Sequence, residues 1–252
     1  MEDYDLFYVE PENIPEPINK DEELKTINCI LDVIEEKQSF ITARDLHSCG
    51  GLTPWIAFQI GCISTYFFSE GKLIEALYSS HASVVIAKII NEIPRIYANS
   101  ISFANVLLKL EYFDLAKEAF LNVLEISYLG DKNEKRIAQI SLANIYNQSG
   151  QLEEAIYYYE KVIPHLSSFP DKVRELILKS MYHIYIKFNE IAGYIFCSKK
   201  LGLLNNNELK KQILSNCNSY IDFFTTSTRL RSLHEIELAD FVYKTWKDKY
   251  NN

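Results

Sequence analysis

Three segments of the chain share one spacing of small and large residues, and this repeat limits the fold more than any other feature. The segments span residues 64–80, 104–120 and 143–159 and read STYFFSEGKLIEALYSS, ANVLLKLEYFDLAKEAF and ANIYNQSGQLEEAIYYY. Each has a small residue first, a large residue in the fourth place and an alanine in the thirteenth, and their starts are 40 and 39 residues apart. A fixed period in this range predicts a stacked array of structural repeats.

Each segment predicts a hairpin of two antiparallel helices. A small residue on the first helix and an alanine on the second allow the two helices to cross closely. Gly71 and Gly150 lie between these marks, where a helix ends in a left-handed cap, and Glu111 takes that place in the second segment. The second helix of the second segment is predicted to bury a stripe at three- and four-residue steps, made of Leu115, Ala119, Val123 and Ile126. No strand-like alternation occurs, so an all-α chain is expected.

Helices are also predicted on both sides of these segments. Residues 21–37 form a strong helical pattern with Asp21 as its N-cap. The first repeat helix is expected to start with Thr53 as cap and Pro54 in its first turn. At the other end, residues 206–224 and 230–249 predict a last helix pair.

A degenerate fourth unit follows when the spacing of 39 residues is applied once more. It covers residues 180–196, with Tyr185 in the large place and Asn189 in the turn. Tyr194 falls where alanine is expected, so different packing is predicted there.

The third segment, NIYNQSGQLEEAIYYYEKVIPH, with Pro164 near its end, resembles the tetratricopeptide repeat family in a variant of 39–40 residues instead of 34. The resemblance implies a right-handed solenoid of antiparallel helical hairpins with capping helices. It divides the chain into an extended acidic arm (1–20), N-terminal capping helices (21–52), the repeats (53–205) and C-terminal capping helices (206–252). It also implies a protein-interaction role in place of catalysis.

Charge is concentrated at the N-terminus. The whole chain has a formal net charge of -8, and its first 25 residues hold nine acidic residues against two lysines. The nearly neutral remainder has no basic stripe, so nucleic acid is not expected as a partner. Within the arm, Tyr4, Phe7 and Tyr8 stand among acids ahead of three prolines. We expect an extended segment that lies in the chain's own groove, docks onto a basic protein, or remains a disordered tail.

Cysteine and histidine usage gives no sign of a metal or redox site. The five cysteines are widely spaced without a CxxC pair, and no histidines stand at metal-ligand spacing, so neither a metal nor a cofactor is expected. His47 and Cys49 are the one close pair that resembles a thiol with its base, although a helix end before a Gly-Gly turn explains them better. The sequence has no basic and apolar leader and no apolar run of membrane-spanning length. These features predict a cytoplasmic protein with free thiols and no membrane insertion.

The predicted binding surface follows from the first helices, which line the concave side of stacked hairpins. The place after the small residue faces this groove and holds Thr65, Asn105, Asn144 and, in the fourth unit, His183. An amide offers a donor and an acceptor together, so Asn105 and Asn144 are suited to pair with the backbone of an extended peptide. The alternative is that these polar residues only keep the groove hydrated or cap a neighbouring helix. Nearby candidates on the third segment's first helix are Tyr146, Asn147 and Gln148.

The sequence argues against one known use of such grooves. A clamp for a C-terminal carboxylate needs a lysine four places before the asparagine, and this chain has Ile101 and Ile140 there. Arg136, Lys172, Arg174 and Lys179 remain as possible sources of positive charge. The leading prediction is an adaptor that binds a protein or peptide partner. A sensor of a small signalling peptide and a structural subunit of an assembly are the alternatives, and the oligomeric state is left open.

Overall fold

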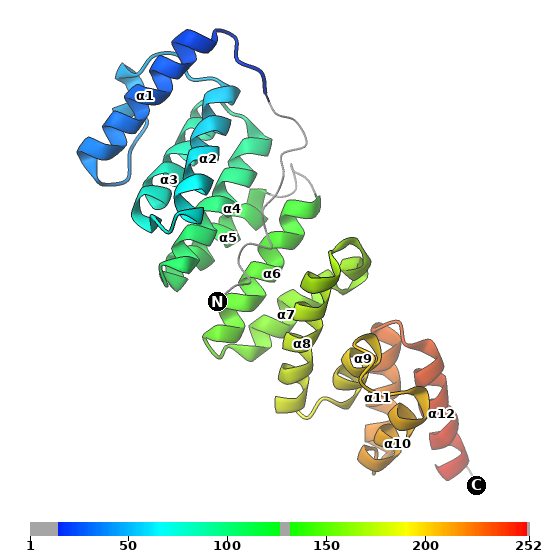
Figure 1. The fold of residues 1–252 in the computed structure, drawn as a ribbon. Coiled ribbons are helices and arrows are strands. Elements are labelled where there is room, and N and C mark those ends of the chain that lie inside the picture. Colours follow the sequence, from blue (N-terminus) through cyan, green and yellow to red (C-terminus); the bar gives the residue numbers. More distant parts are fainter. Residues whose placement is uncertain (1–14, 127–131, 251–252) are drawn as a thin grey trace. The chain divides into compact units, whose positions relative to one another are not determined.

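The computed structural model describes residues 15–126 and 132–250, and these residues form helices joined by short turns (Figure 1). No β-strand occurs among them, so the all-α prediction is confirmed. The chain divides into two compact units, Met1–Ile145 and Tyr146–Asn252. The acidic arm lies almost wholly outside the described residues, so its predicted roles remain predictions.

Unit 1 consists of helices that pack on their neighbours in chain order. Contacts join α2 to α3, α3 to α4 and α4 to α5. The turns of the predicted hairpins at 64–80 and 104–120 fall between α2 and α3 and between α4 and α5, which confirms both. The elements are α1 (Lys20–Lys37), the short 3₁₀ helix η2 (Asp45–Ser48), α2 (Pro54–Ser69), α3 (Leu73–Ile89), α4 (Ile93–Lys109), α5 (Phe113–Ile126) and most of α6 (Lys132–Gln148).

Unit 2 continues with helices that also pack in sequence, except for one insertion. Contacts join α7 to α8 and α8 to α9, and α11 packs on both α9 and α12, while the shorter α10 contacts α9 and α12. The elements are α7 (Leu152–Val162), the 3₁₀ helix η3 (Ile163–Ser168), α8 (Asp171–Lys187), α9 (Ile191–Lys200), α10 (Asn206–Asn216), α11 (Tyr220–Ser232) and α12 (Ile236–Tyr250).

The predicted last pair of helices was wrong in its boundaries. The stretch 206–224 is broken because Ser219 starts a new helix in a capping box, in which its hydroxyl accepts from the Asp222 N–H and Asp222 accepts from the Ser219 N–H. The second predicted helix begins at Ile236, later than expected.

One backbone turn recurs in five hairpins. A residue in the left-handed region ends each first helix, at Gly71 (φ 75°), Glu111 (63°), Gly150 (77°), Asn189 (53°) and His234 (62°). The next N–H then donates to the carbonyl of the large residue in the fourth place, as a helix-ending motif of this kind requires. These bonds are Lys72 to Phe67 (2.9 Å), Tyr112 to Leu107 (2.9 Å), Gln151 to Tyr146 (2.8 Å), Glu190 to Tyr185 (2.9 Å) and Glu235 to Leu230 (2.9 Å).

The last hairpin, α11 with α12, is therefore a fifth unit of the same kind, which the sequence reading missed. Its side chains agree with its backbone. Ser64 Oγ donates to the Ala76 carbonyl at 2.9 Å in the first hairpin, and Ser227 Oγ donates to the Ala239 carbonyl at 3.0 Å in the last. Both pairs are 12 residues apart. The insertion of α10 moves this unit away from the 39-residue spacing. Adding 39 residues once more to the fourth unit therefore does not locate it.

The fourth hairpin crosses differently, as predicted. Its crossing places hold Tyr182 and Tyr194, whose rings meet edge to face with centroids 6.3 Å apart. Beside them, a Cβ on Gly193 would lie 2.5 Å from the Tyr185 ring. Glycine is needed here because the large residue of the fourth place lies directly on the α9 backbone.

Two helix starts test the predicted caps. Thr53 caps α2 by accepting from the Ile56 N–H at 3.3 Å, and Pro54 is in the first turn, as predicted. The prediction of Asp21 as the cap of α1 was wrong. Asn19 takes that place with extended backbone and accepts from the Glu22 N–H at 3.5 Å, while Asp21 lies in the first turn. An acid in the first turn still stabilises the helix through its dipole.

The predicted buried stripe of α5 was wrong at Leu115, which is 51% exposed, and right at Val123, which is fully buried. Ala119 is half-buried, and the crossing Ala116 and Phe120 are fully buried in its place. The side chain of Ile126 lies outside the described residues.

The cysteines depart from the prediction of free thiols. Cys29 of α1 and Cys49, just after η2, form a disulfide with Cα atoms 5.4 Å apart. This excludes the thiol and base pair considered for His47 and Cys49, because no thiol is left on Cys49. The bond joins two parts of one hydrophobic core that also includes Trp55 and Ile56 of α2. Cys62, Cys197 and Cys217 are thiols.

Candidate peptide-binding surface

The hairpin crossings orient the predicted groove residues of unit 1. Ser64, Ala104 and Ala143 are almost completely buried. The next residue on an α-helix is rotated by about 100°, so Thr65, Asn105 and Asn144 point away from the crossing. All three are half-buried, which places polar side chains at a partly open surface.

The three side chains differ in the hydrogen bonds that they already make within the protein. Thr65 Oγ1 donates to the Gly61 carbonyl of its own helix at 3.1 Å. The Asn105 amide makes no hydrogen bond with the described residues, so it is the residue best suited to accept and donate to a ligand. Asn144 takes the same place on α6.

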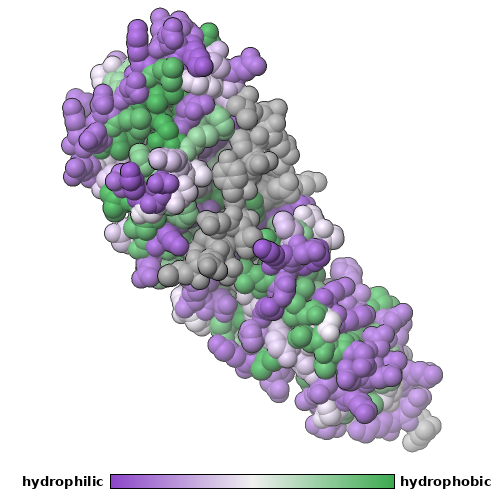
Figure 2. Space-filling model, viewed as in Figure 1, coloured by the Kyte–Doolittle hydropathy of each residue, from purple (hydrophilic) through white to green (hydrophobic). Residues whose placement is uncertain are grey.

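The surface around these residues is apolar and weakly charged. Ile101 and Ile140 are 2% and 0% exposed, so they belong to the core and supply no charge for a carboxylate clamp. Helix α2 contains no charged residue at all. Figure 2 shows hydrophobic residues reaching the viewed surface of unit 1 over α2 and α3.

Arg95 is the cation set most deeply beside α2. It is 9% exposed and lies over the Phe58 ring, 4.9 Å from its centroid. Burial lowers the pKa of Arg95 and raises the pKa of the neighbouring Cys62 thiol. The thiol form of Cys62 is therefore favoured, and a nucleophilic thiolate is not.

In unit 2 the third segment presents an aromatic surface that the sequence reading only partly identified. Tyr146 of α6 stacks on Tyr158 of α7 with centroids 5.6 Å apart and planes 5° apart. Tyr157 meets Tyr158 edge to face, and Lys161 lies over the Tyr157 ring at 4.9 Å. The run of three tyrosines was the available signal, because successive residues of a helix point in different directions. Tyr157 is 55% exposed and Tyr159 is fully buried.

Asn147 has a structural partner, unlike Asn105. Its side chain and that of Ser180 hydrogen-bond the hydroxyl of buried Tyr159, whose pKa burial raises to about 12. Tyr146 is half-buried and Gln148 is exposed at the end of α6.

His183 lies on α8 and is exposed, with its ring 5.7 Å from that of Tyr182. Two cations predicted near it already have acidic partners. Arg174 pairs with Asp171, and Lys179 pairs with Glu175 at 2.6 Å.

A polar network joins four helices of unit 2. The Tyr185 hydroxyl donates to Glu160 at 2.7 Å, and Arg229 of α11 pairs with the same carboxylate. Arg229 Nε also lies 3.9 Å from Glu190. Burial is the main reason that the pKa of Glu190 is raised, and Arg229 opposes it. Each polar group faces another protein group, so the network fixes helices in place and leaves little for a ligand.

The described residues contain no cluster of three or more potential metal ligands. Burial raises the pKa of the Cys197 thiol far above its ordinary value, which disfavours the thiolate. None of the helices in the described ranges is long and apolar enough to cross a membrane.

Comparison with known families gives one match. Residues 97–168, from α4 to the end of η3, match the model of the tetratricopeptide repeat family. A search of curated proteins found no match to the chain. The matched residues include Asn105, Asn144, Tyr146, Asn147 and Gln148, but not His183.

Proposed function

From the match of residues 97–168 to the tetratricopeptide repeat family, we propose that the chain is an adaptor that binds an extended peptide segment of a partner protein along its first helices. Repeats of this family generally serve as protein-interaction scaffolds. The observation that carries the finer proposal is the half-buried Asn105 amide, which makes no hydrogen bond with the described residues. A peptide backbone supplies the donor and acceptor that this amide lacks.

The surroundings support a peptide over a charged small ligand. The uncharged α2, and the absence of charge at the buried Ile101 and Ile140, favour apolar side chains in the ligand. Within unit 2, Tyr146 and Tyr158 form a flat aromatic surface of their own. Aromatic residues with a few placed polar groups are typical of sites where peptides bind.

A structural subunit is a second candidate, because apolar side chains are exposed on the second helices. Ile74 of α3 and Leu115 of α5 are 47% and 51% exposed. Such residues on the outer side of an array favour contacts with other proteins of an assembly.

The cytoplasm is proposed as the place of action, and the thiols of Cys197 and Cys217 support it. The Cys29–Cys49 disulfide supports an oxidising compartment instead, since such bonds are rare in the cytosol. Thiol titration of the denatured chain, isolated from its own cells with alkylation at lysis, decides between them. Five thiols support the cytoplasm, and three contradict it.

The groove is tested by site-specific photo-crosslinking. A photoreactive residue replaces Gln148, and a matched control carries it at Glu118, an exposed residue of α5. We expect the Gln148 probe to capture one partner segment that the Glu118 probe does not. A synthetic peptide of that segment is then titrated against the wild type and against Asn105→Ala with Asn144→Ala. Two lost hydrogen bonds predict about tenfold weaker binding or more.

Equal crosslinking at both positions would contradict a groove ligand. Unchanged affinity of the double variant would contradict the role of the asparagines. Circular dichroism of the double variant must remain that of the wild type, since both residues lie outside the crossings.

A further inference from the structure

The last hairpin exposes a concentrated apolar face. Ile221 and Phe224 of α11 are 66% and 58% exposed, and Tyr243 of α12 is 50% exposed. Phe224 and Tyr243 line a pocket between the two helices.

Comparison with the other hairpins shows that this face is unusual. Four places after the crossing alanine, or after Tyr194 in the fourth hairpin, each second helix of the four earlier hairpins has a fully buried residue. In chain order these residues are Ser80, Phe120, Tyr159 and Ser198. In the last hairpin that residue is Tyr243. In the first hairpin the covering helix is α4, which packs on both α2 and α3 and donates from Asn99 to the Ser83 carbonyl at 3.1 Å. No helix of the described residues covers the α11 and α12 face in this way.

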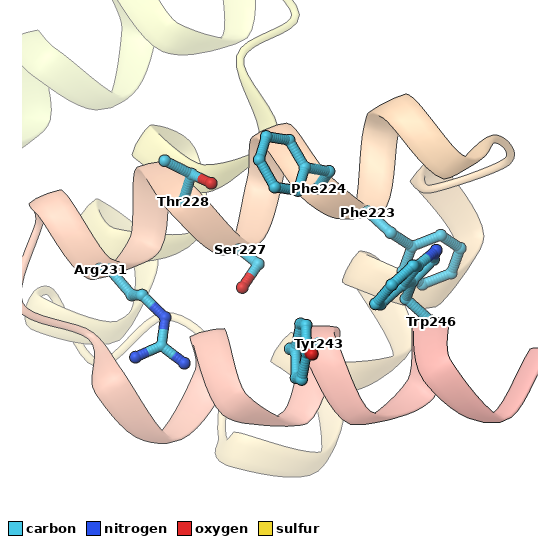
Figure 3. Close-up of a pocket in the computed structure, with 7 residues that line it drawn as sticks. All are labelled: Phe223, Phe224, Ser227, Thr228, Arg231, Tyr243 and Trp246. Carbon is cyan, nitrogen blue, oxygen red and sulfur yellow. The ribbon is translucent and has the colours of Figure 1, made fainter. Parts of the chain in front are cut away.

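The pocket has a volume of about 220 Å³. Figure 3 shows its lining residues, of which Tyr243 and Trp246 come from α12 and the rest from α11. Thr228 takes the place after the small residue Ser227, and Arg231 closes one end of the pocket and pairs with Asp240 of α12. The space is therefore partly apolar, with charge at its rim.

The charges along α12 are self-complementary. Asp240, Tyr243 and Lys247 follow at steps of three and four, which places them on one face of the helix. The acid and the base stand on opposite sides of Tyr243, and both are exposed. Two copies of α12 packed antiparallel about a two-fold axis near Tyr243 therefore bring Asp240 of each copy to Lys247 of the other.

We propose that a second copy of this chain covers the face, with the α11 and α12 hairpins of two copies packed about a two-fold axis. The apolar residues of each copy then fill the position that the following helix fills in the earlier hairpins. A two-fold contact uses the same patch on both subunits, as the charge pattern allows. The surface lies on α11 and α12, and it contains none of the residues Asn105, Asn144, Tyr146 and Gln148 of the proposed peptide surface.

Sedimentation velocity of the full chain over a wide range of concentration tests the proposal. The wild type is expected to sediment as a dimer at the higher concentrations. Tyr243→Glu and Phe224→Glu should shift it to monomer, because each places a charge in the apolar contact. Tyr157→Glu is the matched control, since Tyr157 is an exposed tyrosine of α7 away from this face, and it should leave the dimer unchanged.

Charge reversal tests the two-fold arrangement itself. Asp240→Lys and Lys247→Glu should each weaken the dimer about tenfold or more, because like charges then face each other at both ends. An equal mixture of the two variants should recover the dimer, since every facing pair is again of opposite sign. A wild type that remains monomeric at all concentrations overturns the proposal, and so does a mixture that recovers no dimer. Circular dichroism of each variant shows whether a loss of dimer is a loss of fold.

Discussion

The first and fourth hairpins share one turn but close in different ways. In unit 1, Ser64 and Ala76 let two backbones approach, and the contact is a single hydroxyl on a carbonyl. In unit 2, Tyr182 and Tyr194 take the same places, and their rings meet edge to face. Unit 2 compensates with the network of Glu160, Tyr185 and Arg229. The comparison teaches that hairpins with the same turn can cross through small residues or through aromatic ones.

Exchanging the two kinds of crossing should have the largest effect. Ala76→Tyr places a ring where the side chain is fully buried against α2, and we expect a loss of about 3 kcal/mol or more in the free energy of unfolding. The reverse change, Tyr194→Ala, removes a half-buried ring and should cost about 1 to 2 kcal/mol. Urea unfolding followed by circular dichroism measures both. Equal losses would show that the crossings are interchangeable.

Removing the disulfide should weaken unit 1 alone. Cys29→Ser with Cys49→Ser opens a link between residues 20 apart, and a link of this length contributes about 2 to 3 kcal/mol. Hydrogen exchange read by mass spectrometry should show faster exchange in α1 and α2 and no change in α11 and α12. Cys217→Ser serves as the control, because Cys217 is a thiol in unit 2.

Arg229→Met removes the cation between two partly buried carboxylates. We expect a loss of about 2 kcal/mol, less than for a fully buried ion pair because Arg229 keeps a third of its side chain exposed. Arg174→Met removes an exposed pair with Asp171 and should change stability by less than about 0.5 kcal/mol. The urea midpoints of the two variants test whether unit 2 depends on its network.

Glu111→Gly should stabilise the second hairpin. Glu111 holds a φ of 63°, a region that is unfavourable for residues with a side chain, so glycine should gain up to about 1 kcal/mol. Gly150→Ala, at the matching turn, should lose a similar amount. Thermal melts of both variants give the two signs, and a gain from both changes would contradict a shared turn.

The two units should respond to pH in opposite directions. His81 packs against the rings of Phe40 and Phe103. Burial lowers the pKa of His81 below 6.5, so its contribution to stability is lost as pH falls through the lowered value. Burial raises the pKa of Glu190 above 4.5, so its share is present at low pH and lost as pH rises through the raised value. Lowering the pH from neutral should therefore lower the stability of unit 1. In unit 2 it should protonate Glu190 and remove the free-energy cost of burying its charge. Hydrogen exchange, corrected for the pH dependence of the intrinsic rates, measures the stability of each unit as a function of pH. His81→Gln should remove the pH dependence that His81 gives to unit 1, and Glu190→Gln that which Glu190 gives to unit 2.

The sequence predicts those features that depend on neighbouring residues. The crossing alanines, the turns at Gly71 and Gly150 and the start of α2 at Thr53 are all local. The Cys29–Cys49 bond was missed because it depends on the path that brings η2 back to α1. Asn19 and Asp21 are both good caps, and only the backbone angles decide between them. The fifth hairpin was missed because α10 interrupts the spacing and His234 replaces glycine in the turn.

The candidate site shows the same division. The register places Asn105 and Asn144 on equivalent faces, as the repeat predicts. The register does not show that Asn105 and Asn147 differ in their hydrogen bonds. In the structure, the Asn147 side chain hydrogen-bonds the hydroxyl of buried Tyr159. That distinction depends on the neighbouring helix, which the spacing alone does not contain.

The recurrent left-handed turn has a consequence for recognising related chains. Its five positions carry four kinds of residue, so the letters at this place hold little information, while the backbone angle there is nearly constant. Sequence divergence can therefore remove the repeat from the amino-acid sequence and leave the repeated backbone conformation intact. In this chain, a left-handed residue followed five places later by a fully buried alanine marks four of the five units, including the last one, which the 39-residue spacing passes over.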